Sequence, residues 1–338
     1  MKKIYLLLLA CAVSAGIVGY RYLQEQRRVA NSSPQKTYRI ALLSPAIHPS
    51  IEKIEKAYQR RLGGAASAYQ VTTFNAAGDA QRLNLFAQNI VSGNFDAICT
   101  IGTNTTLLIN NLRQKRGIKT PQIFAAVPAP QQVGLAENSP QLAGVVEEND
   151  IATHLDIVSQ LMPRAKHFLL VYCPTSGQVI THEKSLMEHV VKRLGGTFSA
   201  VAIFSPSEIP AKTTQFIQRA DVVVVLKDNV VVTGLDVLLK ICNSFGKPVI
   251  ASDLDSVDRG ALSALGVHEE QFGTKAAELT IAILAPKSDP APIGFVPADT
   301  PTLKLNSPVC ARYGIDLAAT DALRHRYPLE TTKSSPLA

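Results

Sequence analysis

Two apolar runs in this 338-residue chain end in carboxylate side chains. Residues 247–251 predict a short buried strand, which is followed by Ser252 and Asp253. Residues 222–226 predict another, and it is followed by Asp228 and Asn229. A carboxylate at the rim of a partly dry cleft is costly unless it meets a cation, and the ammonium of an amino acid is a natural partner. Because open α/β sheets bind ligands at the carboxyl ends of their strands, these residues predict a small-molecule binding cleft.

Hydroxyl side chains occupy comparable positions elsewhere in the chain. Thr103 and Thr105 follow an apolar run and open a predicted helix, where hydroxyls and backbone N–H groups can meet a carboxylate. Ser176 lies in a polar turn after another predicted strand. The threonines, like Asp228 and Asp253, have an alternative role as caps of their own helices, and the residues alone leave both roles open.

The chain lacks the short motifs by which hydrolases, phosphate-binding proteins and metal-dependent proteases are usually recognised. It has no G-x-S-x-G elbow, no phosphate-binding loop, no dinucleotide fingerprint and no H-E-x-x-H pair. Its 5 cysteines show neither C-x-x-C spacing nor a neighbouring histidine pattern, which favours buried free thiols over a zinc site or a disulfide framework. We therefore expect a binding protein rather than an enzyme, with no catalytic residues, no metal and no cofactor.

The basic balance of the chain does not indicate a nucleic-acid partner. The net charge of +7 comes from scattered residues, and no zinc finger or RNP-type aromatic pattern accompanies them. The charge pattern instead predicts a solvated basic surface, which is compatible with an anionic membrane.

Strand and helix patterns alternate along most of the chain. A length of 338 residues exceeds one ordinary core, so two lobes of roughly 100 to 150 residues each are expected. Repeated βα units with short connections imply parallel sheets with helices on both faces. The predicted fold class is therefore α/β, with two doubly wound parallel-sheet lobes that meet at a cleft.

The N-terminus has the form of a secretory leader. Lys2 and Lys3 precede an apolar segment that runs to residue 20, and a polar stretch at 21–36 reads as a tether. The leader has three possible fates: an uncleaved membrane anchor, a lipoprotein lipidated at Cys11, or a cleaved signal peptide. All three predict an extracytoplasmic protein, in the periplasm or at the cell surface, and the first two attach it to the cytoplasmic membrane.

The chain closely resembles one family, the extracytoplasmic substrate-binding proteins of bacterial ABC transporters of the tryptophan- and tyrosine-binding type. The resemblance is carried by an ordered set of segments across about residues 37 to 317. They are 44–49, 75–79, 124–128, 227–230, 252–266 and 304–306. It implies the periplasmic-binding-protein-like I fold, in which crossover hinge segments join the lobes. It further implies that about 267–290 returns to the first lobe of 37–148, and that about 291–327 joins the second lobe of 149–266. Residues 328–338 read as a loose tail.

The resemblance also implies a function and further contacts. The chain is expected to capture an amino acid or similar zwitterion by hinge closure and to deliver it to ABC permease and ATPase subunits. The resemblance favours ligand contacts at the residues named above. It also implies contacts at four further positions, His48, Ser50, Val127 and Pro128. Thr175 and Ala129 depart from the family pattern, so the ligand itself is left open. The alternative function is a membrane-anchored extracytoplasmic ligand sensor.

Overall fold

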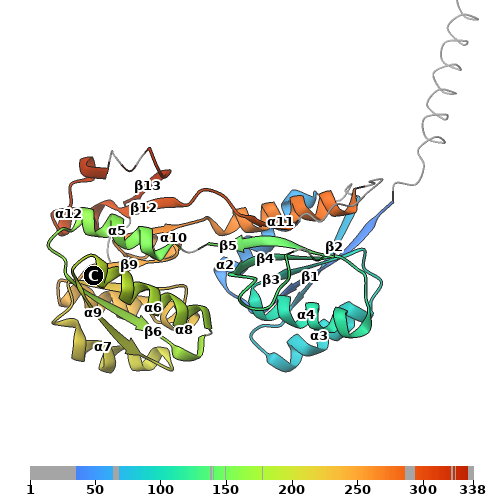
Figure 1. The fold of residues 1–338 in the computed structure, drawn as a ribbon, viewed down its shortest axis with the longest axis horizontal. Coiled ribbons are helices and arrows are strands. Elements are labelled where there is room, and N and C mark those ends of the chain that lie inside the picture. The colour runs from blue at the N-terminus through green and yellow to red at the C-terminus, as the bar shows by residue number, and fades with distance from the viewer. Residues whose placement is uncertain are drawn as a thin grey trace, which may run out of the picture.

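A computed structural model describes residues 36–333, apart from 64–67, 138, 140, 149, 177, 286–293, 321, 322 and 324. These residues form two α/β lobes that lie side by side along the long axis of the molecule (Figure 1). Each lobe holds one sheet of mainly parallel strands with helices on both faces, so the predicted fold class is confirmed. The predicted leader with Cys11, and the tether up to residue 35, lie outside the described residues. Within the described ranges, no helix has both the length and the apolar character needed to span a membrane.

The first lobe contains a six-stranded parallel sheet in the order β11-β5-β4-β3-β1-β2. Every residue of β3 is buried, as expected for a strand that is covered on both faces. Helices α2 and α11 pack on one face of the sheet, and α3 and α4 pack on the other. The bounds are β1 (Tyr38–Ser44), α2 (Pro49–Leu62), β2 (Tyr69–Asn75), α3 (Ala80–Ser92), β3 (Ala97–Ile101), α4 (Thr103–Arg116), β4 (Gln122–Pro128), β5 (Leu142–Glu147), α11 (Glu269–Leu284) and β11 (Phe295–Pro297).

The second lobe contains a seven-stranded sheet in the order β13-β12-β10-β9-β8-β6-β7, in which only β10 and β12 pair antiparallel among the described strands. Strand β8 consists of four valines, and all four are buried. The bounds are α5 (Ile151–Leu161), β6 (His167–Tyr172), the short 3-10 helix η1 (Pro174–Ser176), α6 (Gln178–Arg193), β7 (Thr197–Ala202), α7 (Ile209–Ile217), β8 (Val222–Val225), α8 (Asn229–Thr233), α9 (Leu235–Ser244), β9 (Val249–Ala251), α10 (Leu254–Asp258), β10 (Ser263–Gly266), β12 (Thr302–Asn306), α12 (Ser307–Arg312) and β13 (Leu329–Thr332).

Within the part of the chain that the structure describes, the backbone passes between the lobes three times, after β5, after β10 and after β11. The second passage leads into α11, which packs closely along α2. Gly273 allows this approach, because a Cβ atom there would lie 2.1 Å from the carbonyl oxygen of Ile54. The hydroxyls of Tyr58 and Thr280 join the same two helices at 2.9 Å. A helix late in the sequence thereby completes the lobe that begins the chain.

Several element and lobe boundaries differ from those that the sequence predicts. β11 belongs to the sheet of the first lobe rather than the second, and its Phe295 ring packs edge-on against Phe124 at 4.9 Å. β13 lies within the predicted loose tail and pairs with β12. The helix predicted over 231–245 is broken at Gly234, where a Cβ atom would lie 2.4 Å from Ile209 Cδ1. The sequence patterns also do not predict β5 and β10, which are short and interrupted by glycine or alanine.

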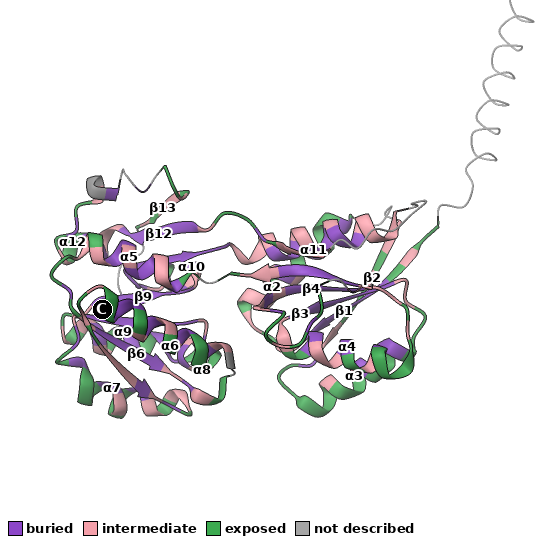
Figure 2. Cartoon of the chain, in the orientation of Figure 1, coloured by how far each residue is buried: buried purple, intermediate pink, exposed green. Residues whose placement is uncertain are grey.

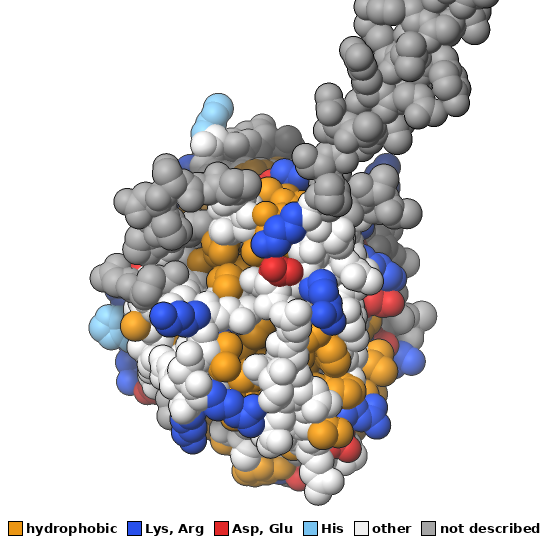
Figure 3. All heavy atoms as spheres, turned by 90° about the vertical axis from the view of Figure 1, so that its right-hand side faces the viewer, with side chains coloured by type: hydrophobic (Ala, Val, Ile, Leu, Met, Phe, Trp, Pro, Cys, Tyr) orange, Lys and Arg blue, Asp and Glu red, His pale blue; other side chains and the backbone are white. Residues whose placement is uncertain are grey.

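Apolar packing follows the lobes. Each cluster of buried side chains belongs to one lobe, and the central strands are buried along their length (Figure 2). The four described cysteines are free and buried within these cores. Lys and Arg side chains are scattered over the outer end of the first lobe instead of forming a stripe (Figure 3). The lobes therefore meet through the crossing segments and through polar contacts.

Candidate functional site

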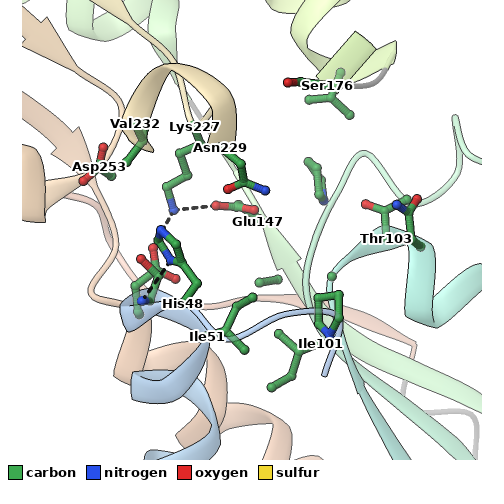
Figure 4. Close-up of a pocket in the computed structure, with 18 of the residues that line it drawn as sticks. His48, Ile51, Ile101, Thr103, Glu147, Ser176, Lys227, Asn229, Val232 and Asp253 are labelled. Atoms are coloured by element: carbon green, nitrogen blue, oxygen red, sulfur yellow. Dashed lines mark hydrogen bonds and ion pairs between the residues drawn. The ribbon is translucent and has the colours of Figure 1, made fainter. Parts of the chain in front are cut away.

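A cavity of about 330 Å³ lies between the lobes and is lined by residues from both of them (Figure 4). Its walls are built from strand ends and from the helix starts that follow them, which is the part of an α/β sheet where ligands bind. The lining residues are Pro45, His48, Ser50, Ile51, Ile54, Ile101, Gly102, Thr103, Asn104, Ala126, Pro128, Glu147, Ser176, Val179, Ile180, Glu183, Lys227, Asn229, Val232, Asp253 and Glu269. The cleft predicted from the sequence is thus present at the predicted edges of the sheets.

The start of α4 forms part of the first-lobe wall. Gly102 precedes the helix with φ of 80°, a conformation that favours glycine, and no side chain caps the helix there. Gly102, Thr103 and Asn104 all line the cavity, so the uncapped end of the helix meets it. Uncapped N–H groups and the positive end of the helix dipole favour an anion at this position.

His48 and Ser50 lie at the start of α2 on the same wall. His48 is the N-cap residue, and its Nδ1 accepts a hydrogen bond from the backbone N–H of Ser50 at 3.3 Å. Pro49 occupies the first turn of the helix, where a missing N–H is tolerated. The structure therefore places both residues as the sequence predicts, on the cavity and at a helix start.

Thr105 and Val127 are not on the cavity wall, in contrast to the prediction from sequence. The hydroxyl of Thr105 is buried and donates to the backbone carbonyl of Ile101 at 2.5 Å, within its own helix start. Val127 is fully buried in the core of the first lobe, whereas its neighbour Pro128 lines the cavity. Alternate residues of a strand face opposite sides, so only one of the pair reaches the cavity.

Asp228 also faces away from the cavity, and its carboxylate is saturated by donors from the protein. It accepts hydrogen bonds from the backbone N–H of Cys173 at 2.6 Å and from the hydroxyl of Ser176 at 2.8 Å. The N–H groups of Val230 and Val231 donate to it as well, which makes Asp228 the N-cap of α8. Asp228 thus holds the Ser176 turn in place, while Ser176 and Asn229 line the cavity.

Asp253 lines the cavity but is engaged on both oxygens. Its Oδ1 accepts the backbone N–H of Ser256 at 2.8 Å and its Oδ2 accepts the hydroxyl of Ser256 at 2.7 Å. Asp255, two residues on, forms an ion pair across the lobes with Lys53 at 2.6 Å. Arg259 pairs with Asp236.

An ion-pair triad that sequence patterns did not single out lies where the lobes meet. Lys227 comes from the second lobe, Glu147 ends β5 and Glu269 begins α11. Lys227 Nζ donates to Oε1 of Glu147 and, at 3.0 Å, to Oε1 of Glu269 (Figure 4). The three residues are separated by tens of positions in the chain, so no local spacing joins them. The nearest sequence signal is Lys227 itself, a charged residue directly after a strongly apolar strand.

Burial sets the protonation of this triad. Desolvation alone lowers the pKa of Lys227, but Glu147 and Glu269 outweigh it, and the pKa is raised above its ordinary value. Burial raises the pKa of Glu269 to about 7, although Lys227 opposes that change. Lys227 is therefore charged throughout the physiological range, and Glu269 titrates near neutrality.

The cavity wall has a definite chemical character. The described lining residues include four carboxylate side chains and one lysine, Lys227: the carboxylates are those of Glu147, Glu183, Asp253 and Glu269. The apolar part consists of aliphatic side chains, and no described lining residue is Phe, Tyr or Trp. In the described ranges, no group of three His, Cys, Asp or Glu side chains is placed to hold a metal ion. The arrangement suits reversible binding of a small molecule with a cationic group.

The family model described as ABC transporter substrate binding protein matches residues 39–322. A curated relative named tyrosine-binding protein, from Clostridioides difficile, is 27% identical over 285 residues, which cover 81% of this chain and 79% of the relative. An uncharacterized Rickettsia prowazekii protein is 26% identical over 255 residues, or 75% of this chain and 78% of that protein.

Solved structures share the fold. An ABC domain in complex with L-Trp from Streptococcus pneumonia has a TM-score of 0.74 and 19% identity, and covers 88% of this chain and 100% of that one. The ligand-free, open structure of a substrate-binding protein with adhesive properties from Clostridium difficile has a TM-score of 0.68 and 20% identity over the same shares. At these identities the likeness concerns the fold.

Proposed function

The chain belongs to the family of ABC transporter substrate-binding proteins, and from that premise we propose that it captures an amino acid in the cavity between its lobes. Proteins of this family act outside the cytoplasm as the binding components of transporters, together with permease and ATPase subunits, and the family is one of transport proteins rather than enzymes. The name of the Clostridioides difficile relative and the L-Trp in the Streptococcus structure support an amino acid as the ligand.

The observation that carries this proposal is the opposite character of the two sides of the cavity. The uncapped start of α4 suits the carboxylate of an amino acid. Carboxylate side chains on the wall, among them that of Asp253, suit its ammonium group, and Thr103 and Asp253 lie on opposite sides of the cavity in Figure 4. The proposed ligand contacts are therefore His48, Ser50, Thr103, Pro128, Ser176, Asn229 and Asp253.

The apolar part of the wall suits the side chain of the ligand. Ile51, Ile54 and Ile101 come from the first lobe, and Val179 and Val232 come from the second. Burial of an aliphatic or aromatic group between them is favourable at about 25 cal/mol per Å² of apolar surface. Selection in this cavity rests on burial and charge, since aliphatic side chains offer no aromatic ring for stacking.

Closure of the lobes is the proposed step between binding and delivery. The ligand bridges residues of both lobes, so it binds more tightly when the lobes approach each other, and this differential affinity favours the closed form. The described crossing segments after β5, β10 and β11 are the positions at which such a hinge motion would take place.

Membrane attachment through the N-terminus is also part of the proposal, with Cys11 as the lipidation candidate. Replacement of Cys11 by serine should abolish labelling by a radioactive fatty acid if the residue carries lipid. A mature N-terminus that retains residues before Cys11 would instead indicate an uncleaved anchor, and one near Gly16 would contradict both forms of attachment.

Identification of the bound molecule tests the proposed ligand class. We expect native mass spectrometry of protein purified under non-denaturing conditions to release an intact amino acid. Calorimetry with the common amino acids should then rank the ligands, with D-ribose as a control that lacks both charged groups. Release of a sugar or a nucleoside, together with no binding of any amino acid, would overturn the proposal.

A further inference from the structure

We propose that Glu147 and Glu269 form the ammonium-binding site of the cavity, and that a cation binding there displaces a proton to the solvent. This inference rests on the proposed function, because it names the residues that would recognise the ammonium group of an amino acid. It also makes a claim that the function alone does not contain, namely that ligand capture is coupled to proton release.

The geometry of the triad leaves room for a second cation. Lys227 Nζ binds the Oε1 atoms of both carboxylates, and their Oε2 atoms accept no hydrogen bond from the residues that the structure describes. Both carboxylate side chains are only slightly exposed, at 14% for Glu147 and 12% for Glu269, and both line the cavity. One ammonium therefore balances two carboxylates at a poorly solvated position.

The other aspartates near the cavity are less able to take the ammonium. The carboxylate of Asp228 accepts hydrogen bonds from donors within the protein, and Asp228 does not line the cavity. Asp253 is engaged on both oxygens by Ser256. Its charge nevertheless reinforces the site, because it adds to the negative potential around Glu269.

Without a bound cation, the excess of negative charge favours the protonated form of Glu269. Burial first, and then the neighbouring carboxylates of Glu147 and Asp253, raise its pKa to about 7, while Lys227 acts in the opposite direction. The charged or titratable groups around it are Lys227 after β8, Glu147 on β5, Asp253 before α10, and Lys53 and His48 on and before α2. An incoming ammonium group supplies the missing positive charge, so the Glu269 proton leaves to the buffer and two charge-assisted N–H···O contacts form.

The direction of the pH dependence follows from this exchange. Below about pH 7 the cation must displace a proton, and above it the carboxylate is already ionised. The affinity for L-tyrosine should therefore be about tenfold lower near pH 6 than near pH 8. Protons released per bound L-tyrosine should approach one near pH 6 and fall toward zero near pH 8.

The first experiment tests the cation site without any amino acid. Glu269 is titrated by NMR in full-length protein with ¹³C-labelled glutamate, in methylammonium chloride or in tetramethylammonium chloride at equal ionic strength. Methylammonium can donate hydrogen bonds and should shift the Glu269 titration to lower pH, whereas tetramethylammonium should not. Glu269→Gln assigns the resonance by its loss, and Glu270→Gln, on the same helix turn but outside the cavity wall, should leave it in place. Equal titration in the two salts would overturn the inference.

The second experiment uses L-tyrosine and calorimetry in buffers of different ionisation enthalpy. Wild-type protein and Glu270→Gln should release protons on binding, and Glu269→Gln should release none and bind with a flat pH profile, about tenfold more weakly near pH 8. Binding of L-tyrosine with no proton release would refute the inference and leave the proposed function intact. A methylammonium effect without binding of any amino acid would support the cation site and refute the proposed ligand class.

Discussion

Two acidic residues next to the cavity show how similar side chains take on different tasks. Asp228 receives donors from Cys173, Ser176 and the start of α8, so its charge is neutralised by the protein itself. Glu269 shares the single ammonium of Lys227 with Glu147 and keeps one oxygen for other use. The first carboxylate therefore supports structure, and the second is available for a ligand.

Asp228→Asn should lower the stability of the second lobe. The amide retains one acceptor but presents N–H groups toward a backbone N–H that needs an acceptor, and the site is fully buried. We expect the free energy of unfolding in urea to fall by about 2 to 3 kcal/mol. Asp236→Asn, which removes an exposed surface ion pair, should change it by about 0.5 kcal/mol or less. Unchanged stability together with lost L-tyrosine binding would restore Asp228 as a ligand contact.

At the scale of elements, the structure agrees with the sequence patterns for several strands and helices whose apolar residues recur regularly. The sequence predicts a strand over 97–101 and helices over 151–161 and 269–284, and the structure has β3, α5 and α11 there. The patterns fail for β5 and β11, which gain their places by pairing in the sheet, β5 with both β4 and β11 and β11 with β5. Site residues divide in the same way: strand ends such as Asp253 are visible from local sequence, whereas the triad depends on contacts between β5, α11 and the loop after β8.

The start of α4 makes a specific prediction about the carboxylate of the ligand. Thr103→Pro removes one backbone N–H at the first helical position, where proline is tolerated. The affinity for L-tyrosine should fall roughly tenfold or more, because a charge-assisted hydrogen bond is lost. Thr103→Ala keeps the N–H and isolates the role of the hydroxyl. Equal affinities for wild type and Thr103→Pro, at unchanged melting temperature, would exclude this helix start from binding.

Helix α5 is joined to β10 by a buried histidine that makes the second lobe sensitive to acid. His154 Nε2 lies 3.0 Å from the hydroxyl of Ser263, and burial lowers the pKa of the ring to about 4 although Asp150 acts in the opposite direction. Because the unfolded chain binds this proton near pH 6.5, stability should be lost as the pH falls from about 6.5 to about 4, by about 3 kcal/mol.

Urea unfolding across this range, with His154→Gln as the variant that lacks the titration, measures this loss. Glu269 has the opposite sign: its raised pKa stabilises the fold below about pH 4.5, and this contribution is lost as the pH rises to about 7. The comparison is therefore best made in the Glu269→Gln background. Equal pH profiles for the Glu269→Gln protein and the Glu269→Gln, His154→Gln double variant would contradict the assignment.

At the scale of the whole molecule, the lobes have separate cores and are joined by polar contacts. Lys53 and Asp255 form a half-exposed ion pair across the lobes, and Lys227 forms buried ones. The exposed pair contributes little to stability. Because each lobe has its own core, the lobes can change their relative position without disturbing either core.

Closure should be visible as compaction of the protein in solution. Small-angle scattering with saturating L-tyrosine should give a smaller radius of gyration than the ligand-free protein. Val232→Trp, on the second-lobe wall, should weaken binding and prevent the decrease, because the larger ring occupies the cavity. Val237→Trp, on the exposed face of α9, should behave as wild type. Tight binding with no change in radius would indicate a cavity that is already closed.

The late return of α11 and β11 to the first lobe has a consequence for how the protein is made. While the ribosome is still translating the second lobe, the side of β1 and β3 that α11 will cover remains open to solvent, and Ile54 and Tyr58 lack the neighbours that bury them. The lobe that is synthesised first therefore cannot complete its folding until most of the second lobe has also been made. We expect such a nascent chain to remain incompletely packed, and therefore accessible to chaperones, until α11 and β11 have been made. A polypeptide in that condition can still be threaded through a narrow translocation channel.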